Sequence, residues 1–303
     1  MKKIFLAGAL LFLAVVAALF IVSAKADFFS GDHQASSRIK KDVIERMSAQ
    51  KEEEKASDQE EQEPQEKPAE IKRPPVEEQP PKKQKDMSED TKAESNGHIV
   101  VIDPGHQRQG DSHLEPNGPG SRGKKARVTG GTRGTQTGIY EYELNLTIGL
   151  ALREELEARG YTVYMTRETH DVNISNMERA KFANEKHADI SVRIHANGAE
   201  NHSAKGACVL VPSASNRFVS DLAGDSKRLG QKILSCYCDA TGMVNQGIQE
   251  NDTMTGINWC EMPVAILEMG YMTNAKDDVN MSQDDFQKKM VQGIANGIDQ
   301  YFE

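Results

Sequence analysis

The chain has 303 residues, a formal net charge of −9 and an apolar fraction of 37%. This length permits one or two domains, and the low apolar fraction indicates that part of the chain does not contribute to a core. The acidic balance argues against nucleic acid as a partner, because nucleic-acid-binding domains carry clustered positive charge.

An apolar run from Ile4 to Val22 follows the basic start Met1-Lys2-Lys3. A signal peptide over residues 1–26 would end at the small-x-small sequence Ala24-Lys25-Ala26. A retained membrane anchor is the alternative, and the length of the run slightly favours it. Either way the basic end stays in the cytoplasm, so we expect an extracytoplasmic protein that is membrane-anchored or secreted.

Residues 27–97 are dominated by Glu, Lys, Gln and Pro and contain few large apolar side chains. Such a segment cannot bury enough surface to offset the entropy of ordering it. We therefore expect a disordered charged linker here. Residues 98–303 remain for one folded domain with a substantial core.

Strands and helices alternate along this domain. Apolar runs predict strands, and apolar residues at helical spacing predict helices. The first predicted strand, 98–103, is followed by a polar, Gly-rich loop to Gly138, and further strands are predicted over 161–166, 189–194, 205–211 and 263–268. Helices are predicted over 141–159, 175–186, 221–237 and 284–301. The alternation predicts the α/β class, with a mostly parallel twisted sheet and helices on both of its faces.

Four polar residues stand where predicted elements end or begin. His106 and His195 follow the first and third predicted strands, Glu268 ends the last, and Glu141 begins the first helix. Because ligands bind beyond the carboxyl ends of parallel strands, we expect these side chains to meet. Two imidazoles and two carboxylates suit a catalytic zinc ion with three protein ligands, an open position for water, and one carboxylate that moves protons.

Glu141 and Glu143, both near the start of the first helix, are alternative candidates for the carboxylate ligand of the metal. Glu141 lies in the first helical turn, where the helix dipole favours a negative charge, and Glu143 is assigned to capping that turn. Glu268 follows an apolar run, so burial should raise its pKa and suit it to proton transfer. A buried glutamate paired with an arginine is the structural alternative. Asn197 and Asn274 border the predicted site and fit either substrate orientation or turns.

Several short motifs in this domain resemble the zinc-dependent N-acetylmuramoyl-L-alanine amidases, bacterial cell-wall hydrolases. The motifs are Val101-Ile-Asp-Pro-Gly-His106, Glu141-Tyr-Glu-Leu-Asn-Leu146, Thr166-Arg167, Arg179-Ala-Lys-Phe-Ala-Asn184, Ile194-His-Ala-Asn197 and Leu267-Glu-Met-Gly-Tyr-Met-Thr-Asn274. The resemblance covers residue 99 to the C-terminus, with every motif in the family's order. It implies zinc ligands at His106, Glu141 and His195, and a catalytic glutamate at Glu268.

The same resemblance implies that 98–303 is a zinc amidase catalytic domain acting on peptidoglycan. The expected reaction is hydrolysis of the amide between muramic acid's lactyl group and L-alanine, with Glu268 taking a proton from the attacking water and returning it to the leaving amine. A zinc peptidase acting on the stem peptide would use the same residues. An inactive wall-binding module would be expected to lack one of them.

Two features stay open at the level of sequence. The link of 34 residues between His106 and Glu141 is longer than in many relatives, and its part from Asn117 to Tyr140 contains no acidic residue and five basic ones: Arg122, Lys124, Lys125, Arg127 and Arg133. This basic loop is either a solvated surface or a surface that attracts the anionic stem or wall polymers. Four cysteines, Cys208, Cys236, Cys238 and Cys260, fit one disulfide or only buried thiols.

Overall fold

The computed structural model describes residues 94–303, and the predicted signal peptide or anchor and most of the predicted linker lie outside the described residues. Contacts with the domain begin within the last residues of that linker. The backbone N–H of Asn96 donates to the carbonyl of Gly160 at 3.0 Å. Within residues 94–303, no helix combines the length and the apolar character needed to cross a membrane.

The domain is built on one six-stranded sheet with the order β4-β1-β5-β8-β6-β7. The strands are β1 (Ile99–Pro104), β4 (Thr162–Met165), β5 (Ile190–Asn197), β6 (Ala207–Val211), β7 (Asn245–Glu250) and β8 (Val264–Tyr271). Strands β4, β1, β5 and β8 run parallel. Strand β6 pairs antiparallel with β8 and parallel with β7. The predicted mostly parallel sheet is confirmed, and strand direction reverses between β8 and β6.

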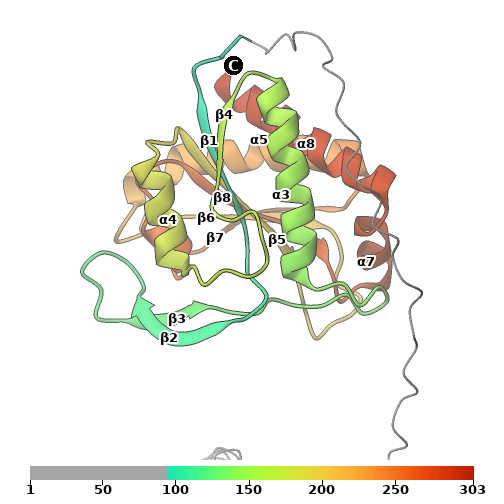
Figure 1. Ribbon diagram of the computed structural model, residues 1–303, viewed down its shortest axis with the longest axis horizontal. Helices are drawn as coiled ribbons and strands as arrows, with labels where there is room; N and C mark the ends of the chain where they lie inside the picture. The colour runs from blue at the N-terminus through green and yellow to red at the C-terminus, as the bar shows by residue number, and fades with distance from the viewer. Residues whose placement is uncertain (1–93) are drawn as a thin grey trace, which may run out of the picture. The chain divides into compact units, whose positions relative to one another are not determined.

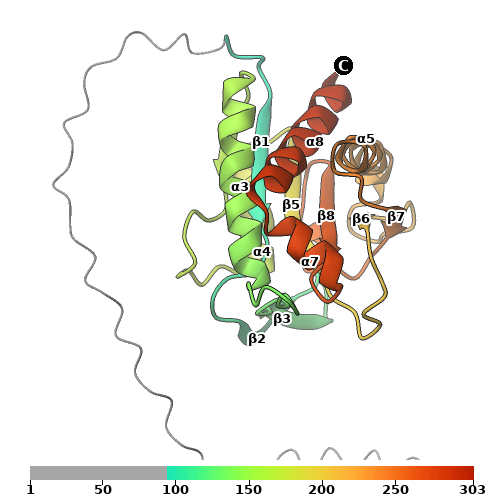
Figure 2. The ribbon, with the colours of Figure 1, turned by 90° about the vertical axis from the view of Figure 1, so that its right-hand side faces the viewer.

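Helices cover both faces of this sheet, as predicted. They are α3 (Glu141–Ala158), α4 (Asn176–Glu185), α5 (Ala223–Thr241, after the 3₁₀ turn η1, Ser220–Leu222), α6 (Thr255–Asn258), α7 (Ala275–Met281) and α8 (Asp284–Phe302). Helices α3, α8 and α5 pack side by side on one face, in front of the strands in Figure 2. Helices α4 and α6 contact each other and cover the other face.

The core is divided between the two faces by the alternation of side chains along each strand. In β1, Val100 and Ile102 belong to the cluster under α3, α5 and α8, whereas Val101 belongs to the cluster under α4 and α6. In β8, Leu267 and Ile266 divide in the same way. Burying each such side chain stabilises the fold by roughly 1.5–3 kcal/mol. The apolar runs therefore pack on both faces, which explains their lack of polar alternation.

The structure corrects the predicted loop between the first strand and the first helix. Residues Asp111–Pro116 and Lys124–Val128 form an antiparallel hairpin, β2–β3, at the bottom of Figure 1. Its strands are largely exposed, so they lack the apolar runs by which strands were predicted. Strand β7 and the short helices α6 and α7 were also not predicted, because β7 has no fully buried residue and the two helices are short.

All four cysteines are free thiols. Of the two alternatives left open by the sequence, one disulfide or only thiols, the structure has the thiols. Cys208, Cys238 and Cys260 are buried and Cys236 is partly buried. The Cys260 thiol donates to the carbonyl of Gly256 at 3.1 Å. Burial raises the pKa of Cys208 and of Cys260 to about 12, so both remain protonated and act as small apolar groups.

Candidate metal centre

A row of polar side chains crosses the sheet on the face covered by α4. The apolar residues of β5 at positions 190, 192, 194 and 196 face α3 and α8, so Arg193 and His195 face the other way. In the strand register, Asp103 is opposite Arg193 and His195 is opposite Glu268. The alternation that builds the core therefore also gathers charged groups near the carboxyl ends of β1, β5 and β8.

A buried ion network supports this row. The carboxylate of Asp103 accepts a hydrogen bond from Arg179 Nη1 at 2.7 Å and lies 2.8 Å from Arg193 Nε. The side chains of Asp103, Arg179 and Arg193 are all at most 5% exposed. Burial opposes ionisation of Asp103, but the two guanidinium groups outweigh this and hold its pKa far below the ordinary value.

Two arginines fix the turn that carries His106. Arg179 donates to the carbonyl of His106 at 3.0 Å, and Arg167 donates to the carbonyls of Pro104 and Gly105 at 2.8 and 3.0 Å. His106 has a backbone φ of 60°, a conformation that costs a non-glycine residue free energy. The arginine contacts offset this cost, so the imidazole is held rigidly at the strand end. Its Nδ1 lies 2.8 Å from the carbonyl oxygen of Thr129.

Glu141 is the first residue of α3, as predicted, and its side chain is held on several sides. Its Oε1 accepts hydrogen bonds from the backbone N–H of Ala196 at 3.1 Å and from Asn145 Nδ2 at 3.3 Å. Its Oε2 accepts from the backbone N–H of Thr132 at 2.9 Å. Glu143 takes the capping role assigned to it, since its carboxylate accepts from the backbone N–H of Tyr140 at 3.0 Å.

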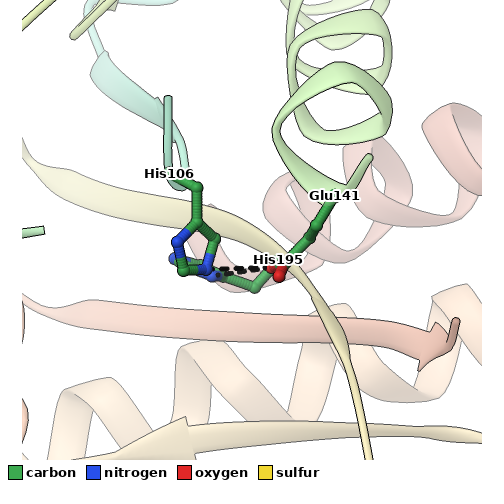
Figure 3. Close-up of side chains that lie close together, drawn as sticks. All are labelled: His106, Glu141 and His195. Carbon is green, nitrogen blue, oxygen red and sulfur yellow. Dashed lines mark hydrogen bonds and ion pairs between the residues drawn. The ribbon is translucent and has the colours of Figure 1, made fainter. Parts of the chain in front are cut away.

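The two predicted histidines converge on Glu141 (Figure 3). His106 Nε2 and His195 Nδ1 each lie 3.2 Å from Glu141 Oε1. One donor atom from each of the three residues lies within 4.8 Å of the others. Two ligands at about 2.0–2.1 Å from a tetrahedral ion are roughly 3.3 Å apart, so this spacing is of the size that such an ion requires.

The hydrogen bonds favour a cation between these groups. His106 Nδ1 faces a carbonyl oxygen, so it carries the proton and leaves the Nε2 lone pair directed at the Glu141 carboxylate. Two lone pairs at this distance repel unless a proton or a metal ion lies between them. Burial lowers the pKa of His195 to about 4, which keeps that imidazole neutral and able to ligate. Burial opposes ionisation of Glu141, but both histidines hold its pKa well below the ordinary value.

Glu268 lies beside this cluster in the same pocket. The pocket has a volume of about 510 Å³ and is lined by His106, Thr132, Glu141, His195, Ala196, Asn197, Gly198, Ala199, Glu200, Glu268 and Thr273. Burial raises the pKa of Glu268 to about 8, with the charge of Glu141 adding to the effect and Arg193 opposing it. The ion pair of Arg193 is with Asp103 rather than with Glu268. The alternative that Glu268 is a structural glutamate paired with an arginine is therefore not what the structure shows.

Some residues of the site were not predicted. The backbone at Gly131 and Thr132 covers Glu141, and a Cβ on Gly131 would lie 2.7 Å from Glu141 Oε2 and 3.0 Å from His106 Cγ. The run of glycines before Glu141 was the available signal. Of the two bordering asparagines, Asn197 lines the pocket, whereas Asn274 accepts hydrogen bonds from Lys276 and Asp277 as the cap of α7.

The basic loop is partly engaged in structural contacts. Arg127 pairs with Glu178 at 2.7 Å, and Lys125 donates to the carbonyl of Thr253 at 2.7 Å. Arg133 donates to the carbonyl of Gly138 at 2.7 Å. Arg122 and Lys124 are exposed on the hairpin. The hairpin is therefore fixed to the domain, and only part of its charge is directed to solvent.

The fold and the side-chain set at the carboxyl edge of the parallel sheet fit a hydrolase, with three residues that could hold a metal ion. The family model for N-acetylmuramoyl-L-alanine amidases matches residues 100–300. The chain belongs to this family, and it is an enzyme that hydrolyses the amide bond between N-acetylmuramic acid and L-alanine in peptidoglycan. The resemblance inferred from the motifs is confirmed.

Individual relatives include named amidases and one uncharacterized protein. The chain is 29% identical over 170 residues to the uncharacterized protein YqiI of Bacillus subtilis, covering 55% of this chain and 76% of YqiI. It is 27% identical to the N-acetylmuramoyl-L-alanine amidase LytC of Bacillus subtilis, covering 68% of this chain but only 36% of LytC. The crystal structure of the amidase Ami1 from Mycobacterium smegmatis superposes with a TM-score of 0.62 at 25% identity, covering 69% of this chain and 98% of Ami1.

Proposed function

We propose that this amidase is zinc-dependent, with His106, Glu141 and His195 as the metal ligands and Glu268 as the proton-transfer residue. The observation that carries the proposal is the convergence of His106 Nε2 and His195 Nδ1 on one oxygen of Glu141, each at 3.2 Å. Two imidazoles and one carboxylate leave a fourth position open, as catalytic zinc sites do. Bound there, zinc would polarise the attacking water and the scissile carbonyl.

The protein's own groups have separate tasks in this reaction. Glu141 and His106 stay fixed, because the backbones of Ala196 and Thr132 bond to Glu141 and that of Thr129 bonds to His106. Glu268 takes the proton of the attacking water and delivers it to the nitrogen of the leaving L-alanine. The positive charge of the metal would lower the pKa of Glu268 from its raised value, so that the carboxylate is available near neutral pH.

The test compares two carboxylates in the loaded enzyme. Glu268→Gln should keep one zinc per chain while activity falls by roughly 10²–10⁴-fold, the usual contribution of a positioned acid–base group. Glu141→Gln should lose zinc and activity together. Zinc content is measured by atomic absorption, and activity by mass spectrometry of digested peptidoglycan, which identifies stem peptides with a free L-alanine amine.

Glu143→Gln is the matched control, since Gln also accepts the hydrogen bond of the helix cap and Glu143 does not line the pocket. This variant should retain both zinc and activity. An active Glu268→Gln variant would remove the proposed mechanism. A zinc-free Glu268→Gln variant beside a fully loaded Glu141→Gln variant would exchange the two roles.

The similarity to cell-wall amidases supports a site of action outside the cytoplasm. We propose further that residues 1–26 direct export, with the apolar run retained as an anchor and residues 27–97 as its linker. Fractionation of cells producing the full chain tests this proposal. Protein recovered in the membrane with Met1-Lys2-Lys3 intact supports the anchor, whereas protein in the medium that begins at Asp27 contradicts it.

A further inference from the structure

A second pocket lies next to the candidate metal centre. It has a volume of about 420 Å³ and is lined by Arg108, Gly130, Gly131, Thr132, Arg133, Tyr140 and Tyr142. Thr132 lines both pockets. Gly131 is close to Glu141 and His106, so the backbone of Gly131 and Thr132 lies between the metal centre and the second pocket. A substrate that reaches over this backbone would occupy both.

Arg133 brings an unpaired cation to this pocket. Its Nε donates to the carbonyl of Gly138 at 2.7 Å, and its guanidinium carbon lies 4.7 Å from the ring centre of Tyr140. These contacts fix the plane of the guanidinium. No carboxylate of residues 94–303 forms an ion pair with it. The Nη groups therefore remain available as a fork of donors for an external anion.

Arg108 supplies a second guanidinium. It pairs with Asp171 at 3.1 Å, but the two side chains are 52% and 75% exposed, and an exposed pair of this kind contributes little free energy. Glu141 and Glu143 are also near this pocket: Glu141 belongs to the candidate metal centre, and the Glu143 carboxylate accepts hydrogen bonds from the backbone of Tyr140 and, at 3.4 Å, from the Tyr142 hydroxyl. None of Asp171, Glu141 and Glu143 lines the pocket. The lining therefore carries two positive charges in a chain whose net charge is −9.

The remaining wall is aromatic. Tyr140 and Tyr142 stack with their ring centres 5.4 Å apart and an interplanar angle of 20°. Stacked rings form a firm apolar surface, and they limit the movement of Arg133 above them. Two guanidinium groups against such a wall recognise a carboxylate on a short carbon chain better than a neutral sugar hydroxyl.

We propose that this second pocket binds a free carboxylate of the peptide stem, carried by the residue next to the L-alanine of the scissile bond. An extended residue spans about 3.5 Å, so a stem that starts at the metal centre passes the Gly131-Thr132 backbone within one or two residues. The inference rests on the proposed position of the reacting amide at the metal centre. It adds to the proposed function a preference for a peptide stem whose second residue has a free, negatively charged carboxylate.

Two synthetic N-acetylmuramoyl dipeptides test the preference. Both have L-alanine followed by a D-glutamyl residue, whose α-carboxyl group is free in one and converted to a carboxamide in the other. The wild-type enzyme should cleave the carboxylate form with a kcat/KM about tenfold higher, mainly through a lower KM, because a charged hydrogen-bond partner is lost in the carboxamide. Arg133→Gln should reduce the two values to the same level.

Arg122→Gln is the matched control, because Arg122 is an exposed basic residue of the same loop that does not line the pocket. It should keep the full preference. Arg133 also contacts Gly138 in the turn before Glu141, so zinc content is measured for each variant. The side chain of Arg108 does not contact that turn. If Arg133→Gln loses zinc, Arg108→Gln is the variant that tests the inference, and it should weaken the preference for the carboxylate form.

Binding to the Glu268→Gln variant separates this inference from the proposed mechanism. Calorimetry with the same two dipeptides needs no cleavage and should show tighter binding of the carboxylate form. Equal binding of the two forms, or an unchanged preference in both the Arg133→Gln and Arg108→Gln variants, would overturn the inference. If the Glu268→Gln variant is still active but binds the carboxylate form more tightly, the inference stands. Only the assignment of Glu268 as the proton-transfer residue is then rejected.

Discussion

Replacing Asp103 by asparagine should destabilise the domain strongly without touching the pocket lining. The Asp103 carboxylate is 2% exposed and is the partner of two guanidinium groups, Arg179 at 2.7 Å and Arg193 at 2.8 Å. Removal of one partner from a buried ion pair costs about 3–5 kcal/mol, because the remaining charge is left buried and unpaired. Arg179 keeps backbone acceptors at Pro104 and His106, so we expect a loss near the lower limit.

Urea unfolding followed by circular dichroism measures this loss. The measurements are made with excess chelator, so that zinc binding to the folded state does not contribute. Arg153→Gln is the control, because the Arg153–Glu168 pair has the same 2.7 Å separation but is 26% and 61% exposed. Its cost should stay below about 1 kcal/mol. A loss for Asp103→Asn as small as that of the control would refute the assignment of a stabilising role to the buried network.

The pH dependence provides a second check on the same residue. The two arginines hold the pKa of Asp103 in the folded state far below its ordinary value, so the unfolded chain takes up the proton first as pH falls. The contribution of Asp103 is therefore complete above about pH 5 and is lost progressively below the unfolded pKa of about 3.9. The difference between wild type and Asp103→Asn should stay constant from pH 8 to 5 and shrink in more acidic solution.

Two further predictions concern the loop before Glu141 and the thiols. The buried carboxylate of Asp278 accepts hydrogen bonds from the backbone of Gln136 and from the backbone and hydroxyl of Thr137. Asp278→Ala should therefore retain helix content but weaken zinc affinity by roughly 10–100-fold in a chelator competition. Unchanged zinc affinity would show that this turn does not position Glu141. In native protein only Cys236 should react with a thiol reagent, since Cys208 and the other two cysteines are buried, and fast modification of more than one thiol would contradict the packing described.

The residues of the candidate site were predictable because their chemistry coincides with element ends. Each of His106, Glu141, His195 and Glu268 lies within three residues of a boundary of an element predicted from apolar patterning. In a parallel sheet, such positions gather at one edge without any knowledge of distant contacts. The structure brings the four side chains together in one pocket, and their roles stay predictions that the zinc measurements above test.

The parts that were not predicted depend on contacts distant in sequence. Strand β7 presents mostly exposed side chains and is defined by its pairing with β6, and the antiparallel direction of β6 follows from its place beside β8. The hairpin β2–β3 is polar and is held by contacts such as Arg127–Glu178 and the bond from Trp259 Nε1 to the carbonyl of Pro116 at 3.0 Å. A glycine-rich turn between two short segments, over residues 117–123, was the one local signal for it.

The strand order of the sheet has a consequence for when the enzyme becomes active. Strand β8 lies between β5 and β6, although both precede it in the chain, and it brings Glu268 beside His195. During synthesis the sheet therefore lacks the strand that joins β5 to β6 until β8 has been made. A polypeptide still being made or exported has its histidines but lacks the glutamate proposed to move the proton. With the proposed role of Glu268, hydrolytic activity would begin only after β8 has been made and has inserted between β5 and β6.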